Sequence, residues 1–334
     1  MTISLKTRIT LWGRGGGRCS FLPCRRDLVL DAEGPDAESL VGEAAHIVAE
    51  EPKGPRGDSA MPVEERNRYP NLILLCSVHH KLVDDQPEAY PSERLHSMKS
   101  EHEQWVRQAL GVDAERQRDD ELYAWVVDEW AGRVHLNQWD AWGSWVLGSG
   151  QPQLWREVDE SLFALREWMF KRVWPRRYRA LEDSLHNFQR VVSDFQEVFR
   201  KHAEADGDSL ITKKFYRIDG DWDEARSHRI HRQYEFHVDL VQDLFLELSR
   251  AANYVCDAVR QTIDPSFRLK EGVATAMSGP HMDLKWRTYR PEYIGDERTA
   301  TPYPGLEAFK TVRATRDRAY GSGTAPSEDS EETS

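Results

Sequence analysis

The sequence has no long hydrophobic run. None of its apolar stretches approaches the ~20 residues that a helix needs to span a bilayer. The first ten residues, Met-Thr-Ile-Ser-Leu-Lys-Thr-Arg-Ile-Thr, lack the apolar core of a secretory signal. These absences predict a cytoplasmic protein with no membrane association, and therefore a reducing compartment.

Cysteine is scarce, with four residues in a chain of 334. So few cysteines in a reducing compartment argue against a disulfide scaffold. Cys19, Cys24 and Cys76 lie near histidines, which favours metal binding. Cys256 stands alone in a helical pattern, and we expect it to be a buried structural thiol.

Positively charged residues are also outnumbered. The chain has 45 Lys and Arg and 57 Asp and Glu, which gives a formal net charge of −12. This balance argues against a protein that passively coats nucleic acid. It does not exclude a nuclease, since binding depends on local positive charge and on bound metal. Residues 1–110, moreover, are close to electrically balanced.

The length allows about two domains. Residues 1–110 are rich in Gly and Pro breaks and carry all the metal-like spacing, whereas residues 111–120 have no apolar face and are expected to be a linker. Residues 121–320 have apolar stripes in steps of three and four, which are typical of long antiparallel helices. Residues 321–334 are predicted to be a disordered acidic tail. The fold class expected is therefore α+β, a small N-terminal module followed by a mainly helical domain.

Within the N-terminal module, the run Gly13–Gly17 predicts a flexible segment. Cys19 to Leu30 predicts a hairpin, and Leu72 to Leu75 a buried strand. Ser92 is a good N-cap for a helix that continues to Leu110.

Four residues have the spacing of a structural metal site. Cys19-x4-Cys24 and Cys76-x2-His79 offer three thiolates and one imidazole. These are the ligands that zinc prefers, and four of them complete a tetrahedral site. We therefore expect a structural Zn²⁺ that staples the hairpin to the end of the strand, in a module with little core of its own. The alternative is three reduced cysteines and a chance histidine.

Further motifs follow in order: Glu43-Ala-Ala-His46-Ile-Val, Asn71-Leu-Ile-Leu-Leu-Cys76 and His80-Lys-Leu-Val-Asp84. With the Cys pair, they make residues 18–105 resemble the HNH endonucleases. That family has a zinc-binding Cys pair, an Ala-His-Ile strand, a loop, an Asn-x-Ile-x-Leu-Cys strand and a His that opens a short helix. The resemblance implies a zinc-stapled ββα-metal fold around one catalytic divalent ion.

The resemblance also implies a role for each matching residue. His46 would be the general base that takes a proton from the attacking water. Asn71 would orient that imidazole or brace the loop. His80 would ligate the catalytic ion, with Asp84, one helical turn later, as a second ligand. A set of His and Asp accepts Mg²⁺, Mn²⁺ or Zn²⁺.

The sequence departs from the family pattern in two places. Ala45 stands where many members carry a metal ligand, so the ion would have fewer protein ligands or take Glu43 or Asp84 instead. His79 stands where the second cysteine of the zinc pair is usual. The adjacent histidines leave two assignments open, and we assign His79 to the zinc and His80 to the catalytic ion, which keeps His80 at the start of the helix.

Three functions follow from these features. The first is a metal-dependent endonuclease that hydrolyses DNA, regulated by its helical domain. By analogy with the family's architecture, it would be the effector of a bacterial antiphage defence or restriction system. The second is a non-catalytic zinc module that binds nucleic acid or a protein, the catalytic site having decayed at Ala45. The third is a helical scaffold that the module only tethers. The helical domain would bind a regulatory partner or form a homo-oligomer.

Overall fold

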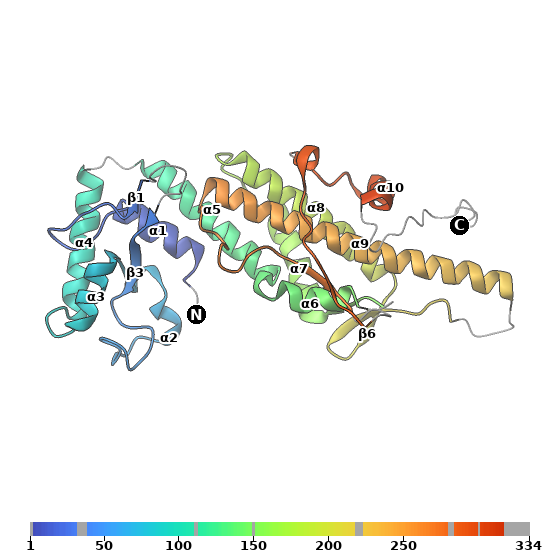
Figure 1. The fold of residues 1–334 in the computed structure, drawn as a ribbon, viewed down its shortest axis with the longest axis horizontal. Helices are drawn as coiled ribbons and strands as arrows, with labels where there is room; N and C mark the ends of the chain where they lie inside the picture. Colours follow the sequence, from blue (N-terminus) through green and yellow to red (C-terminus); the bar gives the residue numbers. More distant parts are fainter. Residues whose placement is uncertain are drawn as a thin grey trace. The chain divides into compact units, whose positions relative to one another are not determined.

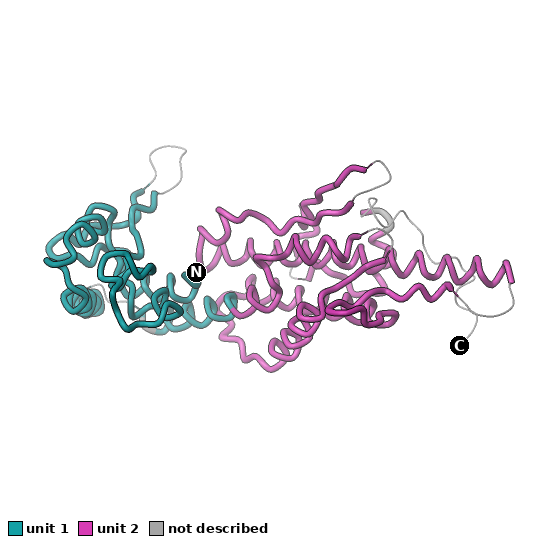
Figure 2. The backbone as a smooth tube through the Cα atoms, turned by 90° about the horizontal axis from the view of Figure 1, so that it is seen from below, with its two compact units in different colours: residues 1–128 teal, residues 129–334 magenta. Residues whose placement is uncertain are grey.

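The structure of the chain, a computed structural model, describes residues 3–31, 39–109, 113–148, 151–217, 223–279, 284–299 and 301–316. It divides into two compact units, residues 1–128 and 129–334 (Figure 2). Among the described residues, every helix is too short or too polar to span a bilayer. The tail predicted at 321–334 lies outside the described residues.

The N-terminal unit places short strands among helices (Figure 1). In chain order its elements are α1 (Leu5–Gly15), β1 (Val29–Leu30), β2 (Ser39–Leu40), β3 (Gly42–His46), α2 (Val63–Arg66), the 3₁₀ helix η1 (Tyr69–Asn71), β4 (Leu72–Cys76), α3 (Ser77–Asp85), α4 (Ser92–Ala109) and most of α5 (Ala114–Arg133).

A two-stranded ribbon and one helix form the centre of this unit. Strands β3 and β4 pair antiparallel, from Gly42 opposite Cys76 to His46 opposite Leu72. Every residue of β4 is buried, and α3 begins directly after it. The apolar run thus supplies the core, and the chain turns into the helix where polar residues begin. This ββα arrangement and the α+β class are those that the sequence predicts.

Two segments differ from their expected structure. Gly13 to Gly15 continue α1 instead of forming a flexible lead. Residues 114–120, expected in a linker, form the first turns of α5. The continuation of this helix is attached to α1, because the Arg14 guanidinium pairs with Glu121 at 3.3 Å and the Asp128 carboxylate accepts the backbone N–H of Leu5 at 2.9 Å.

The C-terminal unit is mainly helical. After the end of α5, its elements are η2 (Leu136–Gln138), α6 (Trp139–Val146), β5 (Gln153–Trp155), α7 (Arg156–Phe170), α8 (Arg179–Lys201), β6 (Ala203–Asp206), β7 (Ser209–Thr212), α9 (Glu224–Thr262), β8 (Ala276–Ser278), β9 (Arg287–Tyr289), η3 (Gly295–Glu297) and α10 (Leu306–Arg316).

Helices α8 and α9 lie side by side and carry the core of this unit (Figure 1). Phe195 of α8 contacts Phe245 of α9, while His202 at the end of α8 contacts His237, nearer the start of α9. Contacts that advance along one helix while receding along the other show that the pair is antiparallel, as the apolar stripes predict.

Candidate functional site

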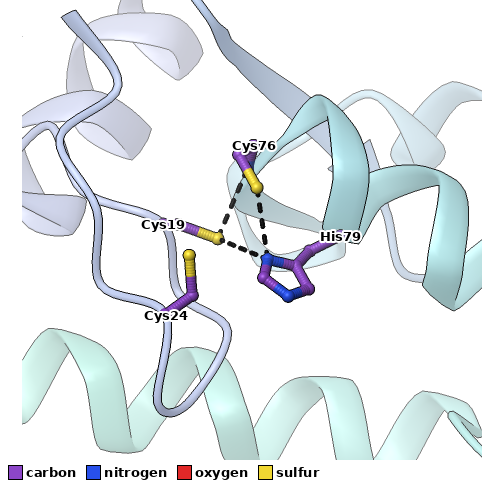
Figure 3. A group of neighbouring side chains, drawn as sticks. All are labelled: Cys19, Cys24, Cys76 and His79. Carbon is purple, nitrogen blue, oxygen red and sulfur yellow. Dashed lines mark hydrogen bonds between the residues drawn. The ribbon is translucent and has the colours of Figure 1, made fainter.

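The three cysteines and His79 meet at one point of the N-terminal unit (Figure 3). Their sulfur and nitrogen atoms all lie within 4.8 Å of one another. The Cys76 sulfur is 3.2 Å and the Cys19 sulfur 3.6 Å from Nδ1 of His79. Within the described parts of the chain, this is the one group of His, Cys, Asp and Glu side chains close enough to hold a metal ion.

Backbone hydrogen bonds bring the two halves of this cluster together. The Cys19 N–H donates to the Arg26 carbonyl at 3.1 Å, which closes the turn that carries Cys19 and Cys24. The Ser20 N–H donates to the Leu74 carbonyl at 2.8 Å, so the same turn is attached to β4. Cys76 ends that strand and His79 lies in the first turn of α3. The hairpin expected here is formed by the bridge between Arg18 and Asp27.

The His79 ring is held in place by Phe21. The two rings are stacked, with centroids 4.0 Å apart and planes 8° from parallel. The stack leaves Nδ1 facing the sulfurs of Cys19 and Cys76. Phe21 was not among the residues that the sequence indicated, and an aromatic residue between two ligand cysteines is the signal that could have identified it.

The pKa shifts within the cluster differ from residue to residue. Burial raises the pKa of the Cys19 thiol to about 12. Burial also lowers the pKa of His79, and the Arg26 charge lowers it further, which favours the neutral imidazole that a metal needs. For Cys24, burial by itself would raise the pKa, but hydrogen bonds from the Arg26 backbone and guanidinium lower it below its ordinary value. Three sulfurs and a neutral imidazole are a donor set that fits a metal such as zinc.

His46 lies at the end of β3 and is half-buried. Its Nε2 is 2.7 Å from Oδ1 of Asn67. Asn67 in turn donates from Nδ2 to the Glu50 carboxylate at 2.8 Å. Neither Asn67 nor Glu50 was indicated by the sequence, because their contact depends on how the loop after β3 folds back.

Asn71 braces that loop. The side chain is buried; its Oδ1 accepts from the Val48 N–H at 2.9 Å, while its Nδ2 donates to the carbonyls of Val48 and Arg66 at 2.8 and 2.9 Å. These bonds tie both ends of the loop between β3 and β4. Of the two roles expected for Asn71, the geometry therefore supports bracing the loop.

His80 lies between two carboxylates. Its Nδ1 contacts Glu43 of β3, and its Nε2 is 3.3 Å from Asp84 of α3. The two carboxylates approach opposite ring nitrogens, so the three side chains contact one another in a row. They do not converge as the Cys and His side chains around His79 do.

Two arginines that the sequence did not indicate support this side of the module. Arg56, whose side chain is only 6% exposed, donates to the Ile47 carbonyl at 2.7 Å, the Val83 carbonyl at 2.6 Å and the Asp84 carboxylate at 2.7 Å. Arg66 is buried and donates to the backbone of the same loop. A buried guanidinium is tolerated only when its donors are satisfied, and here backbone carbonyls satisfy them.

Ala45 is fully buried in the apolar cluster around β4. It pairs in register with Ile73. The residue that departs from the family pattern therefore contributes a methyl group to the core and no ligand.

The family model described as HNH endonuclease matches residues 24–86. The matched segment begins at Cys24 and ends just after Asp84, so it contains the ββα unit with His46, Asn71 and His80. No curated protein matches the chain. The helical remainder lies outside the match, and residues 24–86 are an HNH endonuclease module.

Proposed function

We propose that the protein is a metal-dependent endonuclease that hydrolyses phosphodiester bonds of DNA. The observation that carries the proposal is the position of His46, at the end of β3 in an HNH module, with one ring nitrogen already held by Asn67. An imidazole titrates near neutral pH, so the remaining nitrogen suits a general base.

His80, Asp84 and Glu43 are the proposed holders of the catalytic ion. An imidazole and two carboxylates accept Mg²⁺, Mn²⁺ or Zn²⁺. The donor types suit such an ion, although Glu43 and Asp84 lie against opposite nitrogens of the His80 ring and do not meet at one point in this structure. When bound, a divalent ion supplies positive charge to the phosphate and to the leaving oxygen. Arg56 keeps Asp84 in place, and His46 accepts the proton of the attacking water.

The cluster around His79 is proposed to hold a structural Zn²⁺. Cys19 and Cys24 come from one turn, whereas Cys76 and His79 come from the junction of β4 and α3. An ion shared by the two segments would stabilise the ribbon that positions His46. The unit is small, and a metal can supply part of its folding free energy.

A non-catalytic zinc module is the second candidate. The burial of Ala45 and the row of contacts through His80 favour it, since neither feature gathers three ligands around an ion. Such a module would bind nucleic acid or protein without cutting.

Cleavage of plasmid DNA separates the two candidates. We expect the full chain to nick or linearise supercoiled plasmid in Mg²⁺ or Mn²⁺, and His46→Ala to lose this activity with unchanged zinc content. His96→Ala is the matched control, because His96 is exposed on α4. If the parent protein and His46→Ala both fail to cut in every divalent metal, the non-catalytic module is favoured.

The helical domain is proposed to control when the module cuts, as in a defence or restriction effector. The fusion of a small HNH module to a unit with its own core supports this division. Its partner would be a regulatory protein or a second copy of the chain. Sedimentation over a range of concentrations tests the second copy, and a monomer at all of them would contradict it.

A further inference from the structure

Three side chains form a hydrogen-bonded row behind the proposed general base. Nε2 of His46 lies 2.7 Å from Oδ1 of Asn67, and Nδ2 of Asn67 lies 2.8 Å from the Glu50 carboxylate. His46 ends β3, Glu50 lies in the loop that follows it, and Asn67 follows the last residue of α2. All three residues are partly buried.

The donors and acceptors in this row have only one consistent arrangement. A carboxylate accepts hydrogen bonds and donates none, so the NH₂ group of Asn67 has to face Glu50. The carbonyl oxygen of Asn67 then faces His46 and is an acceptor. The His46 nitrogen opposite it, Nε2, must therefore carry the proton, and in the neutral ring Nδ1 is left as the basic nitrogen.

We propose that Asn67 and Glu50 are positioning residues that hold His46 in the tautomer protonated at Nε2, with Nδ1 as the atom that accepts the proton of water. The proposal rests on the endonuclease function proposed above. Glu50 acts through Asn67, because its charge fixes which way the amide points. When His46 gains a proton, Nε2 still donates to Asn67, so the contact persists through the proton transfer.

The fold of the loop depends on other residues. Asn71 bonds to Val48 and Arg66, and the Arg66 guanidinium bonds to Ala49 and Gly57, all through backbone groups. These buried bonds hold the loop closed. Removing the Asn67 acceptor is therefore expected to change the base more than the fold.

Asn67→Leu tests the acceptor. We expect the plasmid cleavage rate to fall about 10- to 100-fold, because general base catalysis contributes about 10²- to 10⁴-fold and only the positioning part is lost. Zinc content and thermal midpoint should stay near those of the parent. Glu50→Gln should lower the rate less, and Glu51→Gln, at an exposed neighbouring position, should leave it unchanged.

A double substitution, Asn67→Asp with Glu50→Gln, provides the rescue. The carboxylate at position 67 still accepts from Nε2, and the amide at position 50 now donates to it. We expect cleavage within about 5-fold of the parent, in contrast to Asn67→Leu. The carboxylate in direct contact with the ring should also move the acid limb of the pH–rate profile to higher pH. A residue that served only to fold the loop would not produce this shift.

Nuclear magnetic resonance of the histidine ring nitrogens makes the test independent of cleavage. In the full-length parent, His46 should be protonated at Nε2 when neutral, and the double variant should keep this tautomer. A neutral ring protonated at Nδ1 in the parent would overturn the inference. An inactive parent with this ring signature would contradict the endonuclease and leave the His46 contact supported. Full activity of Asn67→Leu beside an inactive His46→Ala would contradict only the positioning role.

Discussion

His237 is a buried basic group of α9, beside the residue that follows the end of α8. It is 6% exposed, and its Nε2 has no hydrogen-bond partner within the described part of the chain. Its ring contacts His202 at 4.7 Å and Phe215 at 6.1 Å. Burial lowers its pKa to about 4, and the charges of His202 and Lys201 act in the same direction. The folded state therefore binds a proton at this ring less readily than the unfolded chain.

The first prediction concerns acid stability. In the unfolded chain the His237 pKa is about 6.5. Between that pH and about 4, the unfolded chain therefore binds a proton at this ring, whereas the folded state leaves the ring neutral. Stability is therefore unaffected at pH 7 and is lost as the pH falls from about 6.5 toward 4. At pH 5 the loss due to His237 is about 2 kcal/mol. His237→Phe should remove it, as measured by urea unfolding followed by tryptophan fluorescence.

His228→Phe is the control for this substitution. His228 lies on the same helix, but its side chain is 70% exposed. The His228→Phe variant should lose as much stability between pH 7 and pH 5 as the parent does. If His237→Phe lost the same amount as well, the ring would not be the source of the acid sensitivity.

Single residues of the site were predictable where their chemistry is local. Cys19, Cys24, Cys76 and His79 have distinctive side chains at short spacings, so the sequence predicted their meeting. Arg56 and Asn67 were not predictable in this way. Each acts through the fold of the loop between β3 and β4, which brings together groups far apart in the sequence, such as Asn67 and His46. Nothing in the type or spacing of such residues indicates a buried partner.

At the scale of elements, the glycine-rich segment that starts at Gly13 differs from its predicted structure. The run from Gly13 predicted a flexible segment, but α1 extends to Gly15 and packs its end against β4. A Cβ on Gly15 would lie 2.8 Å from the Leu74 side chain, and the Gly15 carbonyl is 3.0 Å from Nε2 of His102. The glycine allows close packing there, a role that a sequence does not distinguish from flexibility.

The basic segment between α7 and α8 was also only partly predictable from the sequence. Lys171, Arg176 and Arg179 are exposed there, and Pro175 separates the two helices. Arg176 has a left-handed backbone, with φ of 65°, and its N–H donates to Glu182 at 2.8 Å. The end of α7 and the start of α8 were predictable from proline, whereas this turn depends on a carboxylate of the following helix.

The second prediction concerns Gly143 of α6. A Cβ there would lie 2.3 Å from the Phe245 ring. That ring packs against Trp139, Trp142 and Phe195 and has little room to move. Gly143→Ala should therefore lower the free energy of unfolding of the C-terminal unit by about 1–3 kcal/mol through overpacking. Urea denaturation measures the change.

Gly132→Ala is the matched substitution for comparison. Gly132 is an exposed position of α5, where a Cβ meets nothing within 4 Å. Alanine favours a helix over glycine by about 1 kcal/mol, so this variant should be as stable as the parent or more stable. Equal effects of the two substitutions would mean that contact with Phe245 does not determine the cost at Gly143.

At the scale of the whole molecule, the two units are stabilised in different ways. Residues 129–334 contain a large aromatic core, including Trp130, Trp142, Phe188 and Phe245, all fully buried. The apolar cluster of residues 1–128 is built of smaller side chains around β4, and the Cys and His cluster lies at its edge. The sequence predicted this contrast because ligand spacing and apolar periodicity occupy separate parts of the chain.

The third prediction concerns removal of the metal from the full chain. A strong chelator should lower the melting temperature of the N-terminal unit, since a ligand that binds only the native state at 1,000 times its Kd stabilises it by about 4 kcal/mol. The C-terminal unit, whose core contains no such cluster among its described residues, should melt as before. Differential scanning calorimetry separates the two events. The larger change in tryptophan fluorescence should accompany the C-terminal one, because three of the 12 tryptophans (Trp12, Trp105 and Trp125) lie in residues 1–128 and the rest lie in residues 129–334. Cys24→Ser should melt like the chelated parent and respond less to chelator. An unchanged N-terminal transition in the parent would contradict a structural metal, and equal shifts of both transitions would show that the units unfold together.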